Sequence, residues 1–199
     1  MNRNVSRRHV AILAAPFLLP AMTSDAFGAV PWNELSADDG RSIGRGATVV
    51  VEMMDYNCSF CRLAHAAMGG TLASRPDIKV VRRDLPVLGA SSLTAAAAVQ
   101  AADLQGRIAA MHDVLMRVRA PLDVPLIVRA ATEAGVNPER LGADVDGIVV
   151  KERMARILDV ARRSGATGTP TYFLRSGAFM PGFGSPERFL AFVDGGLSR

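Results

Sequence analysis

The chain has 199 residues, with 23 lysines and arginines against 19 aspartates and glutamates and a formal net charge of +4. Its length suits one domain with an elaboration, large enough to bury a hydrophobic core. Beyond the first 28 residues no run of basic residues interleaved with aromatics occurs, which argues against a nucleic-acid-binding surface. We therefore expect no nucleic-acid partner.

Residues 1–28 have the pattern of an export signal. A basic start precedes an apolar stretch from Val10 to about Met22, and small residues follow. This stretch is shorter than the about 20 residues that a membrane-spanning helix needs. The segment Ser6-Arg7-Arg8-His9-Val10 partly resembles a twin-arginine signal, so the secretory and twin-arginine routes both stay open, as does an uncleaved amphipathic N-terminus. Export predicts a periplasmic, oxidising location.

The segment 29–46 is polar and punctuated by glycines, and we expect it to be a surface lead-in. The apolar run 48–54 begins with β-branched residues and predicts a strand. A helix is predicted from Ser59 to about Ser74. Gly69 and Gly70 are expected to weaken or kink this helix, because glycine is a poor helix former.

The two cysteines of the chain, Cys58 and Cys61, lie between this strand and this helix. The N–H groups and positive dipole end of a helix start favour a thiolate, which lowers the pKa of the thiol and raises its reactivity. A disulfide between these residues closes a very short loop and adds little stability, so the pair suits redox chemistry. Cys58, nearest the helix start, is expected to be the nucleophile, and Cys61 to resolve mixed disulfides.

The rest of the chain predicts a second strand, several helices, a hairpin and a last helix. Asn137 and Pro138 are expected to cap and begin one of the helices, and Ser185 and Pro186 do the same for the last one. Periodicity places Leu93, Ala97, Gln100 and Leu104 on one helix face. The expected ranges are a strand at 78–83, helices between 91 and 164, a strand following Pro170, a hairpin strand at 178–180 and a helix from 185.

Two segments carry a resemblance to a known family. Residues 52–61, Glu-Met-Met-Asp-Tyr-Asn-Cys-Ser-Phe-Cys, resemble the E-F-F-D-Y-x-C-x-x-C signature of DsbA-like, and more closely ScsC-like, thiol-disulfide oxidoreductases. Residues 168–171, Gly-Thr-Pro-Thr, resemble the segment that holds the cis-proline of this family. Residues 110–116 are similar to the family's F-H-D-A-L-M stretch. Two methionines replace the usual aromatics after Glu52.

The resemblance implies an α/β, thioredoxin-like fold with an inserted helical domain. Residues 47–90 and 165–199 would form the thioredoxin-like domain, and 91–164 the insertion with its connecting helix. Glu52 is implied to lie beneath the cysteines and to accept a proton from Cys61; an edge-strand glutamate facing water is the alternative. Thr169 and Pro170 are implied to lie against Cys58, across a cis bond, and to bind a substrate peptide.

These patterns predict an exported thiol-disulfide oxidoreductase that needs no cofactor, because its dithiol carries the two electrons. Its expected partners are cysteine-containing exported proteins and a membrane redox partner. The direction of electron flow stays open. The Ser59-Phe60 dipeptide carries no positive charge to hold a thiolate, so we expect a weaker oxidant than DsbA.

Two alternatives remain. Cys58, Cys61 and His65 are a possible set of ligands for a soft metal such as Cu(I), although the prediction assigns no metal-binding residue. The second alternative is that the chain is a chaperone-like or inactive relative of these enzymes that only holds peptides. Arg62 is as consistent with a surface position as with thiolate support, and His112 is expected to be structural.

Overall fold

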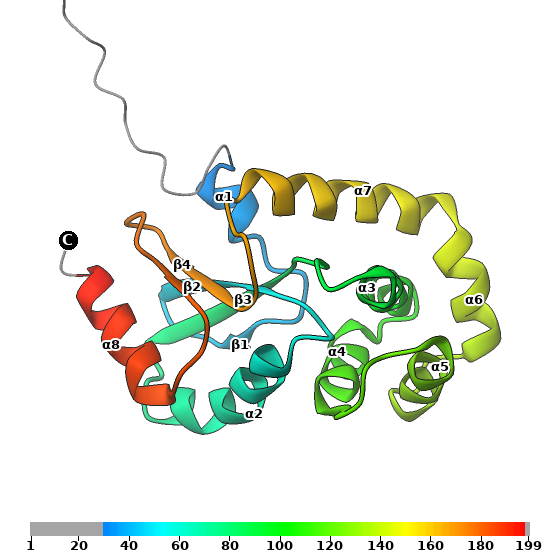
Figure 1. Cartoon of the computed structure of the whole chain (residues 1–199), viewed down its shortest axis with the longest axis horizontal. Helices are drawn as coiled ribbons and strands as arrows, with labels where there is room; N and C mark the ends of the chain where they lie inside the picture. Colours follow the sequence, from blue (N-terminus) through cyan, green and yellow to red (C-terminus); the bar gives the residue numbers. More distant parts are fainter. Residues whose placement is uncertain (1–29, 198–199) are drawn as a thin grey trace, which may run out of the picture.

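A computed structural model describes residues 30–197 of the chain (Figure 1). The expected export signal at 1–28 lies outside the described residues. Within residues 30–197, no helix combines the length and apolar character needed to cross a membrane.

A five-stranded mixed sheet forms the centre of the molecule, in the order β1-β3-β2-β4-β5. The central strand β2 pairs in parallel with β3 and antiparallel with β4. Residues 50–54 of β2 are all buried, as expected for a strand that is covered on both faces. The strands span Ile43–Gly44 (β1), Thr48–Met54 (β2), Ile78–Asp84 (β3), Thr171–Leu174 (β4) and Phe179–Pro181 (β5).

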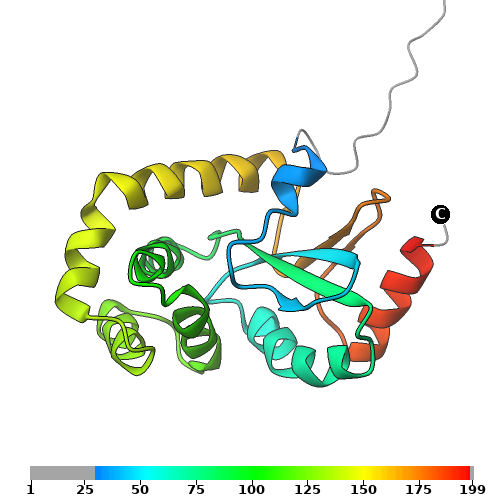
Figure 2. The same cartoon turned by 180° about the vertical axis from the view of Figure 1, so that it is seen from behind.

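Helices cover both faces of the sheet and extend the molecule beside it (Figures 1 and 2). One face packs on α2 and α8 through a cluster that includes Val50, Met68 and Phe189. The other packs on α1 and α7 through Val51, Leu35 and others. The helices span Trp32–Leu35 (α1), Ser59–Ala73 (α2), Ala90–Asp103 (α3), Ile108–Arg117 (α4), Val124–Glu133 (α5), Pro138–Asp146 (α6), Ile148–Arg163 (α7) and Pro186–Leu197 (α8).

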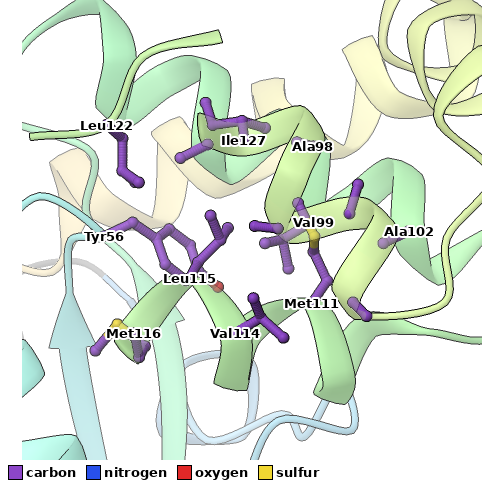
Figure 3. Packing of buried hydrophobic residues seen from close by; sticks show 14 of the residues in the cluster. Tyr56, Ala98, Val99, Ala102, Met111, Val114, Leu115, Met116, Leu122 and Ile127 are labelled. Carbon is purple, nitrogen blue, oxygen red and sulfur yellow. The ribbon is translucent and has the colours of Figure 1, made fainter. Parts of the chain in front are cut away.

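Helices α3 to α7 lie between β3 and β4 in the sequence, as the resemblance predicts. They share a core cluster with the end of β2 and the start of α2, because Met54, Tyr56, Cys58 and Cys61 belong to the same cluster as α3 to α6. Figure 3 shows Tyr56 entering this cluster next to Leu115. The helical region therefore packs directly behind the two cysteines.

Segment 30–46 differs from the expected surface lead-in. Val30, Leu35 and Arg41 are buried, and β1 adds an edge strand antiparallel to β3. At Gly46 the backbone passes so close to β3 that an added Cβ would lie 1.8 Å from the carbonyl carbon of Asp77. The prediction missed this segment because an edge strand of two residues has no periodicity to detect.

The helices bear on several local expectations. Helix α2 is continuous through Gly69 and Gly70, where an added Cβ would meet nothing within 4 Å. Of the predicted face of α3, Gln100 is buried and Ala97 and Leu104 pack against the core, whereas Leu93 is 39% exposed. Asn137 caps α6 by accepting a hydrogen bond from the N–H of Arg140, and Ser185 accepts one from Arg188 at the start of α8.

Candidate active site

Cys58 occupies the N-cap position of α2, directly after β2 and a short turn. Its Sγ accepts a hydrogen bond from the backbone N–H of Cys61 at 3.3 Å. This N–H is one of the groups that a helix start leaves without an intrahelical partner. Cys58 is 5% exposed and Cys61 is fully buried, so Cys58 is the thiol nearer to solvent, as predicted.

The surroundings of the two thiols shift their pKa values in opposite directions. Hydrogen bonding from the Cys61 side chain, helped by Thr169 and the backbone N–H groups of Phe60 and Cys61, lowers the pKa of Cys58 to about 6 despite partial burial. Burial, the hydrogen bond to Cys58 and the charge of Glu52 together raise the pKa of Cys61 far above that of a free thiol. The site therefore favours one thiolate, at Cys58.

The loop before β4 closes the site from a distant part of the sequence. The Thr169–Pro170 peptide bond is cis, as the resemblance predicts. The Cys58 thiol donates a hydrogen bond to the carbonyl oxygen of Thr169 at 3.2 Å. Thr169 thus touches the candidate nucleophile with its backbone.

The carboxylate of Asp55 fixes the turn that leads into Cys58. One of its oxygens accepts hydrogen bonds from the N–H of Asn57 and the hydroxyl of Ser92, both at 2.7 Å. The other accepts from the N–H groups of Val87 and Leu88 at 2.9 and 3.0 Å. Because all of these donors are satisfied by one buried group, the turn is tied to the loop that follows β3.

Asn57 ties the same turn to the helical region. Its amide nitrogen donates to the hydroxyls of Ser91 and Ser92, and its Oδ1 accepts from the N–H of Leu122 at 2.8 Å. Asp55 and Asn57 were not predicted from the sequence as residues that hold the turn. The signal was present, since Asp and Asn two residues apart before a helix are typical of turns in which side chains bond the backbone.

Glu52 lies behind Cys61 and not at a sheet edge facing water. It is 2% exposed on the central strand β2. Its carboxylate accepts a hydrogen bond from the hydroxyl of Tyr172 at 3.1 Å and lies 3.5 Å from the guanidinium of the buried Arg82. Burial raises the pKa of Glu52, although Arg82 and Tyr172 oppose this rise. The carboxylate therefore faces a buried cation on one side and the dithiol on the other.

A second buried polar group lies between the sheet and α4. The guanidinium of Arg41 donates to Asp84 at 2.6 Å and to the hydroxyl of Tyr56 at 3.0 Å. The Tyr56 hydroxyl also bonds Nδ1 of His112 at 3.0 Å. His112 is therefore held in the interior, which agrees with a structural role. Arg41 could not be recognised from the sequence, because nothing in its segment predicted burial.

A groove opens beside the start of α2, with a volume of about 1050 Å³. Phe60, Leu63, Met116 and Val118 contribute apolar side chains to it, and Phe60 and Leu63 are more than half exposed. Basic residues of α2 and of the segment that follows α4 also line the groove, including Arg62 and Arg119. The groove thus joins an exposed apolar surface to the residues next to Cys58.

Arg62 and His65 lie near the site, and their hydrogen bonds and ion pairs are made with residues other than the two cysteines. Arg62 donates to the carbonyl oxygens of Tyr56 and Ala120, both at 3.0 Å, and links α2 to the loop between α4 and α5. His65 lines the groove and faces Asp113 on α4. Among the residues that the structure describes, His65 groups with His112 and Asp113 as potential metal ligands, and the cysteines are not part of that group.

Comparison with known proteins identifies the family. Residues 49–194 match the model of the DSBA-like thioredoxin domain. A thioredoxin-like oxidoreductase from Silicibacter pomeroyi DSS-3 superposes with a TM-score of 0.75 at 31% identity, covering 85% of this chain and 99% of that one. A periplasmic thioredoxin-like protein from Salmonella enterica serovar Typhimurium gives 0.68 at 26% identity, covering 84% and 95%. The catalytic domain of Proteus mirabilis ScsC shares the fold, with a TM-score of 0.70 at 23% identity over 88% and 94% of the two chains.

Curated relatives match over part of their length only. The Na(+)/H(+) antiporter NhaA 3 of Salinispora tropica is 29% identical over 139 residues, which is 69% of this chain and 21% of the antiporter. The chain spans about a fifth of the length of the curated relatives that it matches. The similarity therefore concerns one region of those proteins. The thioredoxin-like fold with a helical insertion, expected from the sequence, is confirmed by the family match and the solved structures.

Proposed function

The chain belongs to the DSBA-like thioredoxin domain family, and from this premise we propose that it is an exported protein thiol-disulfide oxidoreductase. The observation that carries the proposal is the opposite shift of two neighbouring thiols, since the pKa of Cys58 is lowered to about 6 and that of Cys61 is raised. At neutral pH Cys58 is then mostly thiolate, the form that attacks disulfides, while Cys61 keeps its proton.

In the first step the Cys58 thiolate attacks one sulfur of a substrate disulfide. The substrate S–S bond breaks, a mixed disulfide forms, and the other substrate sulfur leaves as a thiolate. In the second step Cys61 loses its proton and attacks Sγ of Cys58. The substrate is released reduced, and Cys58 and Cys61 are left as a disulfide. The reverse sequence oxidises a substrate dithiol, so the same residues serve both directions.

Glu52 is the proposed acceptor of the Cys61 proton. Its charge acts on Cys61, and burial raises the pKa of its carboxyl group, which brings the carboxylate closer to the basicity of a general base that works near neutral pH. A bridging water would complete this transfer if the two groups do not meet directly. Arg82 supplies the counter-charge when Glu52 is ionised.

The Thr169–Pro170 loop and the groove are the proposed substrate-binding elements. The backbone of Thr169 already contacts Cys58, so a peptide that pairs with this loop brings its sulfur to the nucleophile. The exposed Phe60 and Leu63 next to it fit the apolar side chains of an incompletely folded protein. The proposed substrates are cysteine-containing exported proteins, and a membrane redox partner would restore the starting redox state.

A periplasmic location is proposed from the signal-like pattern of residues 1–28 and from the similarity to the periplasmic thioredoxin-like protein of Salmonella. Antiport activity is not part of this proposal, because the match covers about a fifth of the length of the antiporters.

The test is turnover of a protein disulfide. The wild-type chain should catalyse the reduction of insulin by a small thiol, and a variant with Cys58→Ser and Cys61→Ser together should not. An Asp146→Asn variant, changed at an exposed position of α6 away from the groove, leaves the dithiol in place and should retain most of the activity. Equal rates for the wild type and the double cysteine variant would contradict the proposal.

A further inference from the structure

Three potential metal ligands from two helices meet beside the groove. His65 comes from α2, and His112 and Asp113 are consecutive residues of α4. One nitrogen or oxygen atom from each lies within 4.8 Å of the others. The Nε2 atom of His65 is 3.8 Å from Oδ1 of Asp113, and the two imidazole rings are 5.3 Å apart between centroids.

His112 provides a second and independent observation. It is 1% exposed, and its Nε2 atom has no hydrogen-bond partner among residues 30–197. Buried polar atoms nearly always have a partner, so this atom needs an explanation. Its other ring nitrogen, Nδ1, is held by the Tyr56 hydroxyl at 3.0 Å. The ring is therefore fixed, with Nε2 as its unused atom.

We propose that His65, His112 and Asp113 form a site for a divalent transition metal ion such as Zn²⁺. Two imidazoles and one carboxylate are a donor set that zinc accepts, with bonds of about 2.0–2.2 Å. Tetrahedral bonds of this length place ligand atoms about 3.3–3.6 Å apart, so the 3.8 Å between His65 and Asp113 needs only a small side-chain rotation. Asp113 is exposed and able to make it.

The tautomer of His112 does not stand in the way of binding. The Tyr56 hydroxyl accepts from Arg41 and shares a hydrogen bond with Nδ1 of His112, in which either group can be the donor. With the tyrosine as donor, the hydrogen on Nε2 of His112 has no acceptor. Metal binding at Nε2 requires the proton on Nδ1, donated to the Tyr56 oxygen, as ligand histidines usually do with a fixed partner. The hydroxyl hydrogen of Tyr56 then lacks a partner instead. The number of unpaired hydrogens does not change, and the metal bond is gained.

The charges around the site are compatible with a cation. Arg82 and Arg117 act on His65, and Arg82 and Arg41 act on His112. Each arginine has its own counter-charge: Glu52 for Arg82, Glu133 for Arg117 and Asp84 for Arg41. The carboxylate of Asp113 opposes the remaining positive field. His65 and Asp113 both line the groove, so the fourth coordination position is open to water or to a group bound there.

The site is separate from the dithiol, and the experiment uses this separation. Zinc binding is measured by calorimetry on the full, tag-free chain in which Cys58 and Cys61 are both replaced by serine. We expect one Zn²⁺ per chain. Because even loss of an outer partner of a metal ligand costs about 10- to 100-fold in affinity, His65→Ala and Asp113→Asn should each weaken binding by at least about tenfold. Asp146→Asn, an exposed carboxylate on α6, is the matched control and should change nothing.

A spectroscopic measurement distinguishes this site from binding by sulfur. Co²⁺ added to the wild-type reduced chain should give the visible bands of a nitrogen and oxygen site. A thiolate-to-cobalt charge-transfer band would show that the ion is bound by the cysteines instead. The proposal is overturned if the cysteine-free variant does not bind Zn²⁺, or if it binds equally well with and without His65 and Asp113. Insulin reduction by the wild-type chain and by Asp146→Asn, measured without added metal, reports separately on the oxidoreductase activity.

Discussion

The two sides of the dithiol differ in what they do to a thiolate. On the outer side, which we call the rim, Cys58 lies at the start of α2 and against the Thr169 loop. The hydrogen bond from the Cys61 side chain, helped by Thr169 and the backbone N–H groups of α2, lowers the pKa of Cys58 to about 6. On the inner side, the floor, burial raises the pKa of Cys61, and the hydrogen bond to Cys58 and the charge of Glu52 add to this rise. Only two residues, Ser59 and Phe60, lie between the two cysteines. The division into an attacking and a resolving thiol follows from burial and nearby charge, since both residues are cysteines.

The floor also differs from the rim in its cost to the fold. The rim is built largely from backbone groups of a helix start and a loop, which are available there without the burial of a charged side chain. The floor requires a carboxylate and a guanidinium to be removed from water together, with Arg82 at 3% and Glu52 at 2% exposure. Such a pair is stable only while both members are present.

The largest effect should come from the cysteines themselves. Cys58→Ser should abolish exchange, because no thiolate remains on the rim. Cys61→Ser should let Cys58 attack but block release, so mixed disulfides with substrate proteins should accumulate. Non-reducing gel electrophoresis after incubation with an oxidised protein substrate measures both. If Cys58→Ser traps substrate as well as Cys61→Ser does, the assignment of rim and floor is reversed.

Removal of the floor cation should destabilise the fold. Arg82→Met leaves the Glu52 carboxyl buried without its counter-charge and should cost about 3–5 kcal/mol in the free energy of unfolding, measured by urea denaturation. The matched control is Lys79→Met, on the same strand as Arg82. It removes the partly exposed ion pair between Lys79 and Asp38 and should cost less than about 1 kcal/mol. Combining Arg82→Met with Glu52→Gln should recover most of the loss. Without that recovery, packing rather than charge explains the effect.

The rim sets the redox potential. A Cys58 pKa of about 6 lies above the approximately 3.5 of DsbA, whose strong oxidising power comes from its stabilised reduced form. We therefore expect a potential more negative than the about −120 mV of DsbA, measured by equilibration with glutathione. A potential equal to that of DsbA would falsify the link between rim and potential.

The smallest effect concerns pH. Because the pKa of Cys58 is lowered to about 6, its thiolate is formed above that pH and lost as the pH falls through it. The rate of alkylation of the reduced chain by iodoacetamide should be flat above pH 7 and fall about tenfold per unit below pH 6. In Cys61→Ala the midpoint should rise, since the side-chain hydrogen bond from Cys61 is lost. An unchanged midpoint would assign the shift to the helix start alone.

Much of the fold follows from local sequence signals. The β-branched run of β2, the Asn137-Pro138 start of α6 and the Pro170 boundary of β4 are each determined by neighbouring residues, and each lies where it was predicted. The pair Cys58 and Cys61 was located in the same way. The resemblance correctly implied the cis bond before Pro170, and Glu52 is buried rather than facing water at a sheet edge.

The parts that the sequence did not predict depend on partners far along the chain. Arg41 is buried because Asp84 and Tyr56 surround it, and no pattern near Arg41 reports this. Asp55 acquires its role from donors at 87, 88 and 92. On α3 the predicted face is right for Gln100 and wrong for Leu93, because close packing against several neighbours selects alanine over a large residue such as Leu93.

Two hydrogen bonds at the redox centre join positions that are distant in the chain. Thr169 contacts Cys58 across 111 residues, and Leu122 bonds Asn57 across 65. Closing loops of this length costs conformational entropy, which the contacts offset only when the chain is folded. Until the Thr169 loop packs against Cys58, its contribution to the lowered pKa of that thiol is missing. We therefore expect an incompletely folded chain to carry a less acidic Cys58 thiol and to cross-link its neighbours less readily.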